Sequence, residues 1–339
     1  MASLIDSAKK TIAENFGGPV QKLAPRQFSL NETPSLAGKV AVVTGGSEGI
    51  GYGITHTFLN HDISKLFILS VSEEVVKGAK KSVAQELGQE KADRAEWIKC
   101  DLTDWTETKK AAERINNSTD RLDILVNNAG RGIMNYELTE YGVDRHMALN
   151  HFGHVLLTSH LLSLLKQTSE EHGTVRIVNL ASNAHQGAPS DTKFESLEEL
   201  NQDLGPNAQY GRSKLAIILY TRYFARHVTQ GFAKVLMNAS HPGFVSTRQS
   251  TEHIHEAYPL AGYMMSKVVE PFKKDQFDGA LSSVYAATLT ERSGEYICPP
   301  ATAETGSELS QNEELGEQLM ELTRKIISEK FELFDDRKF

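Results

Sequence analysis

Tyr210 and Lys214 have the residue types and the spacing for acid–base chemistry. At positions i and i+4 their side chains lie on the same face of a helix. A phenol is a weak acid near neutral pH, but a neighbouring ammonium group lowers its pKa. The pair is therefore suited to giving a proton to the alkoxide that forms when a carbonyl is reduced. Because the same spacing also arises by chance in many helices, this interpretation needs support from other residues.

Ser182 provides such support, because it follows the apolar run VRIVNLA directly. A hydroxyl at the end of a buried strand can donate a hydrogen bond to a substrate oxygen. That bond gains strength as negative charge builds on the oxygen.

A glycine-rich turn, Thr44-Gly45-Gly46-Ser47-Glu48-Gly49-Ile50-Gly51, stands between an apolar run and an apolar helix. Glycines let the chain turn sharply, and they let backbone amides and a helix N-terminus approach a diphosphate. A plain tight turn is the alternative interpretation. The position after the first strand favours dinucleotide binding.

These residues need a parallel sheet to bring them together, and the hydrophobic pattern predicts one. Short, continuously apolar runs are typical of strands buried on both faces, and amphipathic segments separate them. We expect a single α/β domain of the Rossmann type, with a doubly wound, seven-stranded parallel sheet. The runs are KVAVVTG, KLFILSV, EWIKCDL, LDILVNNAG, VRIVNLAS, AKVLMNAS and EYICPP. The main helical segments are predicted over residues 73–88, 106–117, 141–167 and 210–228.

The chain divides into an N-terminal arm (residues 1–36), the Rossmann domain (37–300) and a C-terminal segment (301–339). Within the last, 301–309 reads as a linker, and the helix after it is capped by Ser310 or Asn312. The arm has one arginine and three acids, which disfavours a mitochondrial presequence. We therefore expect a cytoplasmic protein, with a mitochondrial location as the alternative.

Composition excludes several classes of protein. The 36 lysines and arginines stand against 44 acids, a net charge of −8, so a nucleic-acid partner is not expected. Cys100 and Cys298 make neither a disulfide framework nor a zinc site. No run approaches the roughly 20 apolar residues of a membrane span. His151 and His154 are three apart on a predicted helix, but no nearby carboxylate completes a metal site, so no metal is predicted.

In order and spacing these motifs resemble the short-chain dehydrogenase/reductase family over about residues 37–298. They are T-G-x-x-x-G-x-G, Asn127-Asn128-Ala129-Gly130, Asn150, Ser182, Tyr210-x-x-x-Lys214 and His241-Pro242-Gly243. The resemblance implies a catalytic tetrad in which Asn150 holds a water that links Lys214 to solvent. Its members are Ser182, Tyr210, Lys214 and Asn150.

The resemblance also implies binding of NADP or NAD. Two of the positions have alternatives, because Asp101 is either an adenine contact or a helix cap, and Thr247 either a nicotinamide contact or a helix cap. The expected contacts are Gly45, Ser47, Glu48, Gly49, Ile50, Gly51, Ser70, Asp101, Leu102, Asn128, Ala129, Gly130, Tyr210, Lys214, Pro242, Gly243, Val245 and Thr247.

The choice between the two cofactors stays open. The second strand ends Leu69-Ser70-Val71-Ser72, with neither the acid that binds a 2′-hydroxyl nor the arginine that binds a 2′-phosphate. Glu48 argues against NADP, whereas Ser70 and Ser72 could donate hydrogen bonds to a phosphate.

Two further segments concern the substrate. An insertion at 185–209 should lie beside the mouth of the active site, and residues 248–276 should form a lid over an apolar pocket. The insertion, the VEPFKK and GALSSVYAA segments and the acidic C-terminal helix resemble the retinol-dehydrogenase-like and WW-domain-oxidoreductase-like branch, and more closely fungal light-induced alcohol dehydrogenases of the Bli-4 type. That branch implies lipophilic alcohols, aldehydes or ketones.

Two other functions remain as alternatives to a carbonyl or alcohol oxidoreductase. A non-catalytic NAD(P)-sensing regulator is expected to have lost part of the tetrad. A nucleotide-sugar epimerase has a different glycine spacing and a larger C-terminal domain. A homodimer is possible, because the helices after the fourth and fifth strands carry more apolar residues than one stripe needs, namely Leu156, Leu157, Leu161, Leu162, Ile217, Ile218 and Tyr223.

Overall fold

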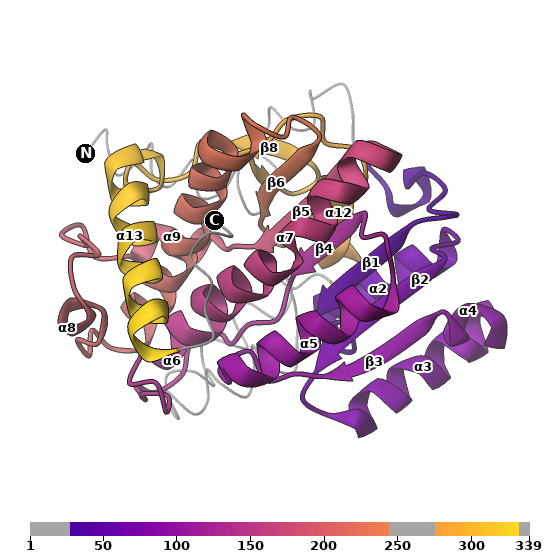
Figure 1. The fold of residues 1–339 in the computed structure, drawn as a ribbon, viewed down its shortest axis with the longest axis horizontal. Coiled ribbons are helices and arrows are strands. Elements are labelled where there is room, and N and C mark those ends of the chain that lie inside the picture. The colour runs from indigo at the N-terminus through magenta and orange to yellow at the C-terminus, as the bar shows by residue number, and fades with distance from the viewer. Residues whose placement is uncertain (1–27, 244–274, 332–339) are drawn as a thin grey trace.

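A central sheet of eight strands, in the order β3-β2-β1-β4-β5-β6-β7-β8, organises the computed structural model, which describes residues 28–243 and 275–331 (Figure 1). Every predicted strand forms. The strands are β1 (Val40–Thr44), β2 (Lys65–Ser70), β3 (Ala95–Lys99), β4 (Ile124–Asn127), β5 (Val175–Leu180), β6 (Val235–Ser240), β7 (Tyr296–Cys298) and β8 (Thr302–Glu304).

The first seven strands pair in parallel, as predicted, but the sheet has one more strand than expected. The eighth, β8, pairs antiparallel with β7, with Tyr296 opposite Glu304. It lies in the stretch predicted as a linker, 301–309, so that prediction was wrong. An edge strand of three residues, none of them buried, carries no continuous apolar run, which is the signal that identified the other strands.

Helices cover both faces of the sheet. One face packs on α2 (Gly49–Asn60), α3 (Glu73–Leu87) and α12 (Gln276–Thr288). The other packs on α5 (Trp105–Ser118), α7 (Gly153–His172) and α9 (Pro206–Phe224). The remaining helices are α4 (Gln89–Asp93), α6 (Arg145–Met147), α8 (Leu197–Leu200) and α13 (Glu313–Lys330), with 3-10 turns at Leu30–Glu32, Asn183–Gly187 and Leu309–Gln311.

The helix predicted over 141–167 is interrupted. It starts only at Arg145, where the Asp144 carboxylate accepts a hydrogen bond from the amide of Met147. A π-helical turn, Ala148–Phe152, then separates α6 from α7. A second π-helical turn, Ala225–Thr229, follows α9. Apolar periodicity cannot reveal one extra residue in a turn, so both π-helical turns were missed.

The C-terminal helix α13 lies against α9, as Figure 1 shows in yellow. Its cap is Asn312, whose side chain accepts from the amide of Leu315. Asn312 is one of the two caps predicted. Three leucines of α13 share a hydrophobic cluster with α9, whose members include Leu315, Leu319 and Leu322 of α13 and Leu215, Ala216 and Leu219 of α9.

The seven apolar residues that suggested a dimer interface are all buried inside this one chain. They therefore no longer argue for an interface, and a homodimer stays a prediction. Among the described residues, no helix combines the length and the apolar character that crossing a membrane requires.

Candidate active site

The glycine-rich turn and the Asn127–Gly130 corner lie at the ends of β1 and β4, which are neighbours in the sheet. Strand order reverses here, and in such sheets the crevice at this point receives ligands. The Thr44 hydroxyl accepts hydrogen bonds from the amides of Asn128, at 2.9 Å, and Ala129, at 2.8 Å. In return the Asn128 side-chain amide donates to the carbonyl of Thr44 at 2.8 Å. These bonds fix the two motifs relative to each other.

The turn needs its glycines. Gly45 and Gly49 have φ of +62° and +52°, in the left-handed region that side chains disfavour. A Cβ on Gly51 would lie 2.0 Å from the carbonyl oxygen of Gly45 and 2.5 Å from the Asn128 side-chain nitrogen. Glu48 stands at the N-cap of α2 without a side-chain cap bond, so it leaves the first amides of this helix available. A close backbone approach and an uncapped helix N-terminus fit the diphosphate of a dinucleotide.

The second strand ends beside this turn. The Ser47 and Ser70 hydroxyls are 3.4 Å apart, and the Trp97 indole donates to the carbonyl of Ser70 at 3.0 Å. Val71 follows with 61% of its surface exposed. The end of β2 therefore presents hydroxyls and an aliphatic side chain and supplies no charge of its own.

Asp101 does not cap a helix. One of its carboxylate oxygens accepts from the amide and the hydroxyl of Thr103, whereas α5 is capped by Asp104. The cap alternative was therefore wrong, and the adenine contact stays a prediction. Leu102 is buried beside it, and Ile50 is half-buried at the start of α2.

The structure describes Pro242 and Gly243, at the end of β6, but not the residues that follow. Val245, Thr247 and nearly all of the lid predicted over 248–276 lie outside the described residues, as does most of the N-terminal arm.

Three of the four predicted catalytic residues lie where β5 meets α9. Ser182 follows β5 directly, and Tyr210 and Lys214 lie one turn apart on α9. The Lys214 ammonium donates to the carbonyl of Leu180 at 2.7 Å and lies 5.7 Å from the centre of the Tyr210 ring. The Ser182 hydroxyl donates to the Asn183 side-chain oxygen at 3.2 Å and also acts on the Tyr210 phenol, whose pKa it lowers. The structure thus brings hydroxyl, phenol and ammonium together.

Asn150, the fourth predicted residue, lies in the π-helical turn and is 1% exposed. Its side-chain nitrogen donates to the Ser213 hydroxyl at 2.9 Å and to the carbonyl of Arg131 at 3.2 Å. Its side-chain oxygen accepts from the amide of Arg131, also at 3.2 Å. A Cβ on Gly130 would lie 2.9 Å from that oxygen and 3.7 Å from the Lys214 nitrogen, so Asn150 and Lys214 meet beside Gly130.

Burial shapes the acid–base properties of the pair. It lowers the pKa of Lys214 to about 7, because the ammonium is removed from water. Burial also raises the pKa of the Tyr210 phenol, and the hydrogen bond from Ser182 acts in the opposite direction. Near neutral pH the phenol is protonated, and the pKa of the lysine lies close to the pH of the solution. A small change in the surroundings of Lys214 can then change its protonation state.

The insertion at 185–209 is held against α9. Arg212, 1% exposed, donates to the carbonyls of Glu199, at 2.9 Å, and Leu200 at the end of α8. Gln209 donates to the buried Asp144 carboxylate at 2.8 Å. Arg212 lies two residues after Tyr210, so its bonds fix the insertion to the helix that carries the phenol, whereas the Gln209 bond joins the start of that helix to the cap of α6.

Sequence reasoning missed the groups that hold the tetrad in place. Ser213 supports Asn150, and Thr44 joins the two cofactor motifs. His154 was considered as a metal ligand, rejected in favour of a plain buried or surface histidine, and given no role in the site. The described residues contain no group of three or more His, Cys, Asp or Glu side chains that could hold a metal ion. For Ser213 the available signal was its position between Tyr210 and Lys214 on the same helix.

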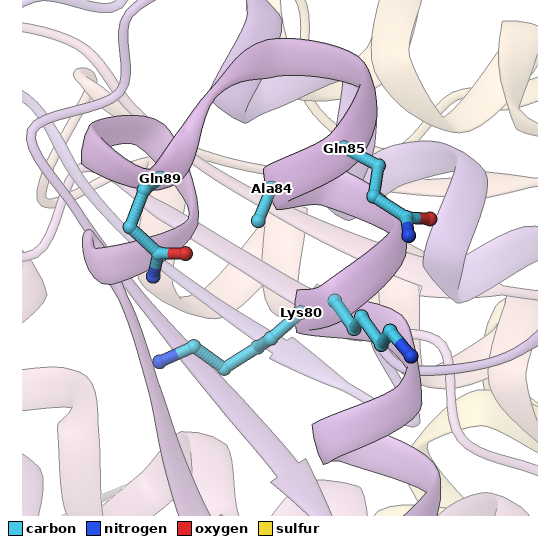
Figure 2. Close-up of a pocket in the computed structure, with 5 residues that line it drawn as sticks. Lys80, Ala84, Gln85 and Gln89 are labelled. Atoms are coloured by element: carbon cyan, nitrogen blue, oxygen red, sulfur yellow. The ribbon is translucent and has the colours of Figure 1, made fainter.

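A separate surface hollow of about 410 Å³ lies over α3 and the start of α4 (Figure 2). Lys80, whose ammonium donates to the carbonyl of Ala95 at 2.7 Å, is one of its walls. None of its residues belongs to the glycine turn or to the tetrad, and we assign it no chemistry. Its lining is Lys80, Lys81, Ala84, Gln85 and Gln89.

Comparison with known proteins agrees with this geometry. A family model described as short chain dehydrogenase matches residues 39–193. The chain is 60% identical to the Neurospora crassa oxidoreductase named bli-4, mitochondrial, over 96% of this chain and 80% of that protein. It is 33% identical to mouse retinol dehydrogenase 12 over 77% of this chain and 78% of that protein. The Pseudomonas aeruginosa structure described as a RhlG/NADP active-site complex superposes with a TM-score of 0.59 and 26% identity, covering 78% of this chain and 95% of that one.

Proposed function

Since the chain belongs to the short-chain dehydrogenase/reductase family, we propose that it transfers a hydride between a nicotinamide cofactor and a carbonyl or alcohol carbon of a lipophilic small molecule. The observation that carries the proposal is the convergence of Ser182, Tyr210 and Lys214 beside the glycine turn that fits a dinucleotide. When bound, the nicotinamide supplies or accepts the hydride. The residues of this chain handle the substrate oxygen and its proton.

Each member of the tetrad has a distinct part in the reductive direction. The Ser182 hydroxyl donates a hydrogen bond to the substrate oxygen, which becomes more negative as the carbonyl is reduced. The Tyr210 phenol gives its proton to that oxygen, so a C–O–H group is completed and a phenolate remains. Lys214 in its charged form stabilises the phenolate and lowers the cost of that transfer. Asn150, held by Ser213 and Arg131, fixes the π-helical turn beside Lys214. Lys214 returns a proton to the phenolate and regains one from solvent through a water held at Asn150.

The cofactor is a nicotinamide dinucleotide, and NADP and NAD both remain open. A neighbour of this fold carries NADP in its active-site complex. In this chain, the pair of hydroxyls at Ser47 and Ser70 supports a hydrogen-bonded 2′-phosphate. Glu48, exposed in the turn, opposes a 2′-phosphate through charge repulsion. Parallel titrations with the two cofactors decide between them.

The substrate is proposed from relatives that act on lipophilic alcohols. One such relative is named retinol dehydrogenase 12. We propose the same substrate class for this chain and commit to no individual compound. The residues predicted to line the pocket fall in 248–276, outside the described residues. A panel of alkyl and polyene aldehydes, aliphatic ketones and their alcohols therefore tests the class.

The cellular location is a second open point. The Neurospora relative carries the word mitochondrial in its name. We propose the cytoplasm, with mitochondrial import as the alternative. Fractionation of cells that express the chain with and without residues 1–27 separates the two locations.

Replacement of Tyr210 by phenylalanine tests the function. Loss of the phenolic proton should reduce turnover by about 10²-fold or more. Affinity for NADPH or NADH, followed by the fluorescence of the reduced nicotinamide, should stay nearly unchanged. Tyr223→Phe is the matched control, because Tyr223 lies on the same helix and its hydroxyl accepts from Arg324, away from the tetrad. Most of the activity surviving in Tyr210→Phe would overturn the proposal, and cofactor binding without turnover of any compound would favour the NAD(P)-sensing alternative.

A further inference from the structure

His154 contacts both halves of the site. It lies in the first turn of α7, four residues after Asn150, and is 4% exposed. Its Nδ1 lies 3.3 Å from the carbonyl oxygen of Asn150, and its Nε2 lies 3.0 Å from the Thr44 hydroxyl. One ring therefore joins the π-helical turn of Asn150 to the end of the strand that leads into the glycine turn.

The partners determine where the ring carries its proton. A carbonyl oxygen can only accept, so Nδ1 must be the protonated nitrogen and must donate to Asn150. In a neutral ring Nε2 then has a lone pair and accepts from the Thr44 hydroxyl. Burial lowers the pKa of His154 to about 4, and the charge of Lys214 acts in the same direction, so the ring is neutral at working pH.

The Thr44 hydroxyl is fully used by this arrangement. It accepts from the amides of Asn128 and Ala129 and has a single proton to donate. His154 Nε2 is the nearer acceptor at 3.0 Å, and the carbonyl of Val126 is farther at 3.4 Å. Four groups are thus connected in sequence: the Asn150 carbonyl, the His154 ring, the Thr44 hydroxyl and the amides of Asn128 and Ala129.

We propose that His154 is a positioning residue that fixes the turn carrying Asn150 relative to the cofactor cradle made by the β1 turn and the Asn128–Ala129 corner. The proposal rests on the proposed function, in which Asn150 and the cradle serve one reaction. It predicts that the two bonds of the ring have separable effects. The bond to Asn150 should matter for turnover, and the bond to Thr44 should matter for cofactor affinity.

Two substitutions separate the bonds. His154→Gln places an amide oxygen near the position of Nε2, so it keeps an acceptor for Thr44 and loses the donor to Asn150. His154→Asn places an amide nitrogen near the position of Nδ1, so it keeps the donor to Asn150 and loses the acceptor for Thr44. His160→Gln is the matched control, because His160 is 8% exposed and lies six residues further along the same helix.

The first readout is hydrogen–deuterium exchange in the cofactor-free protein, which does not depend on activity. His154→Gln should speed exchange in the peptide over 148–152, and His154→Asn in the peptide over 127–130. Leaving one buried donor or acceptor unpaired corresponds to a change of about tenfold in the local opening equilibrium. His160→Gln should leave both peptides unchanged. Equal exchange in all four proteins, or the same change in both peptides for both His154 variants, would overturn the proposal.

The second readout separates cofactor affinity from turnover. His154→Gln should lower kcat by about tenfold and leave the Kd for reduced cofactor within about threefold, because only the Asn150 bond is lost. His154→Asn should raise that Kd by about threefold or more and leave kcat at saturating cofactor near the wild-type value. The reverse pattern would contradict the proposal. If the wild-type protein turns over no substrate, the proposed function fails, while the exchange and Kd measurements still test His154.

The Thr44 end of the connection provides a check if either histidine variant fails to fold. Thr44→Ser keeps the hydroxyl and should keep the exchange pattern of the wild type. Thr44→Val removes the hydroxyl and should speed exchange at 127–130, while the His154–Asn150 bond keeps exchange at 148–152 near the wild-type rate. Equal exchange in the serine and valine variants would count against a connection through this hydroxyl.

Discussion

The Lys214 ammonium nitrogen lies 5.7 Å from the centre of the Tyr210 ring, on the same helix, and the lysine is only 4% exposed. The same burial that places the charge beside the phenol also makes the charge costly. The pKa of Lys214 therefore falls to about 7, and pH decides whether the phenolate can be stabilised.

The reductive reaction should accordingly slow above neutral pH. It needs Tyr210 protonated, which its raised pKa ensures, and Lys214 charged, which holds only below about pH 7. We expect kcat/KM for carbonyl reduction to fall as pH rises through about 7, because this parameter reports groups of the free enzyme. Lys214→Arg keeps its charge at all these pH values, so it should be slower at pH 6 but show a flat alkaline side. An equally steep fall in the arginine variant would assign the titration to another group.

Gly130→Ala should impair turnover more than folding. The added Cβ would lie 2.9 Å from the Asn150 side-chain oxygen and must displace it. We expect a loss in kcat of about tenfold, because a tenfold change in rate corresponds to a free energy near the lower end of the range usual for overpacking. Gly132→Ala is the control, because a Cβ there meets no atom within 4 Å. Similar kinetics for the two variants would show that Asn150 tolerates displacement.

Gly51→Ala should abolish tight cofactor binding. Its Cβ would lie 2.0 Å from the carbonyl oxygen of Gly45, so the turn must open. The Kd for NADPH and NADH, measured by fluorescence, should rise by at least about tenfold, as expected when a close backbone approach is lost. Gly78→Ala, on α3 with open space around it, should leave Kd unchanged and add about 0.5–1 kcal/mol of stability. Unchanged affinity in Gly51→Ala would remove the glycine turn from the cofactor site.

Thr323→Val should weaken the fold at the π-helical turn. The Thr323 hydroxyl donates to the carbonyl of Leu319, so it accepts from His151 Nε2 at 2.9 Å. Valine would leave that buried N–H unpaired, at a cost of about 1–3 kcal/mol in the free energy of unfolding. Ser328→Ala, on the exposed side of α13, should change the stability by less than about 0.5 kcal/mol. Denaturant unfolding measures both, and equal stabilities would show that α13 and the π-helical turn are not coupled.

His151 and His154 should make the fold sensitive to acid. Burial lowers the pKa of His151 to about 3 and that of His154 to about 4, from an ordinary value of 6.5. Between these lowered values and 6.5, the unfolded chain binds more protons than the folded one, so the free energy of unfolding rises with pH. We expect the free energy of unfolding to fall as the pH drops from about 6.5 towards 4. His151→Gln should fall less steeply than the wild type over that range, and identical slopes would contradict the assignment.

Much of the fold could be predicted because its strands are buried on both faces. Such strands leave continuous apolar runs, and all seven parallel strands were found from them. Short and half-exposed elements leave no such run, which is why β8 was read as a linker. The π-helical turn at Asn150 was missed for a different reason, because one extra residue in a turn changes no composition.

The candidate site divides in the same way. The motif residues are recognisable because the reaction and the cofactor constrain their types, as for Tyr210, Lys214 and Gly51. The supporting residues are constrained only by which side chains they contact in the folded protein. His154 and Thr44 are 110 positions apart, and no local pattern relates a histidine on a helix to a threonine on a strand. Three-dimensional geometry was required to see that they meet.

The C-terminal helix α13 packs on α9, and its Thr323 accepts a hydrogen bond from His151 of the π-helical turn. These contacts form late in synthesis. The two bonded residues are 172 positions apart, and α13 is translated after every strand of the sheet. A domain generally folds as a unit, so the turn that carries Asn150 gains its outer support only once the last helix has left the ribosome. The catalytic turn of the finished protein therefore depends on residues that are translated last.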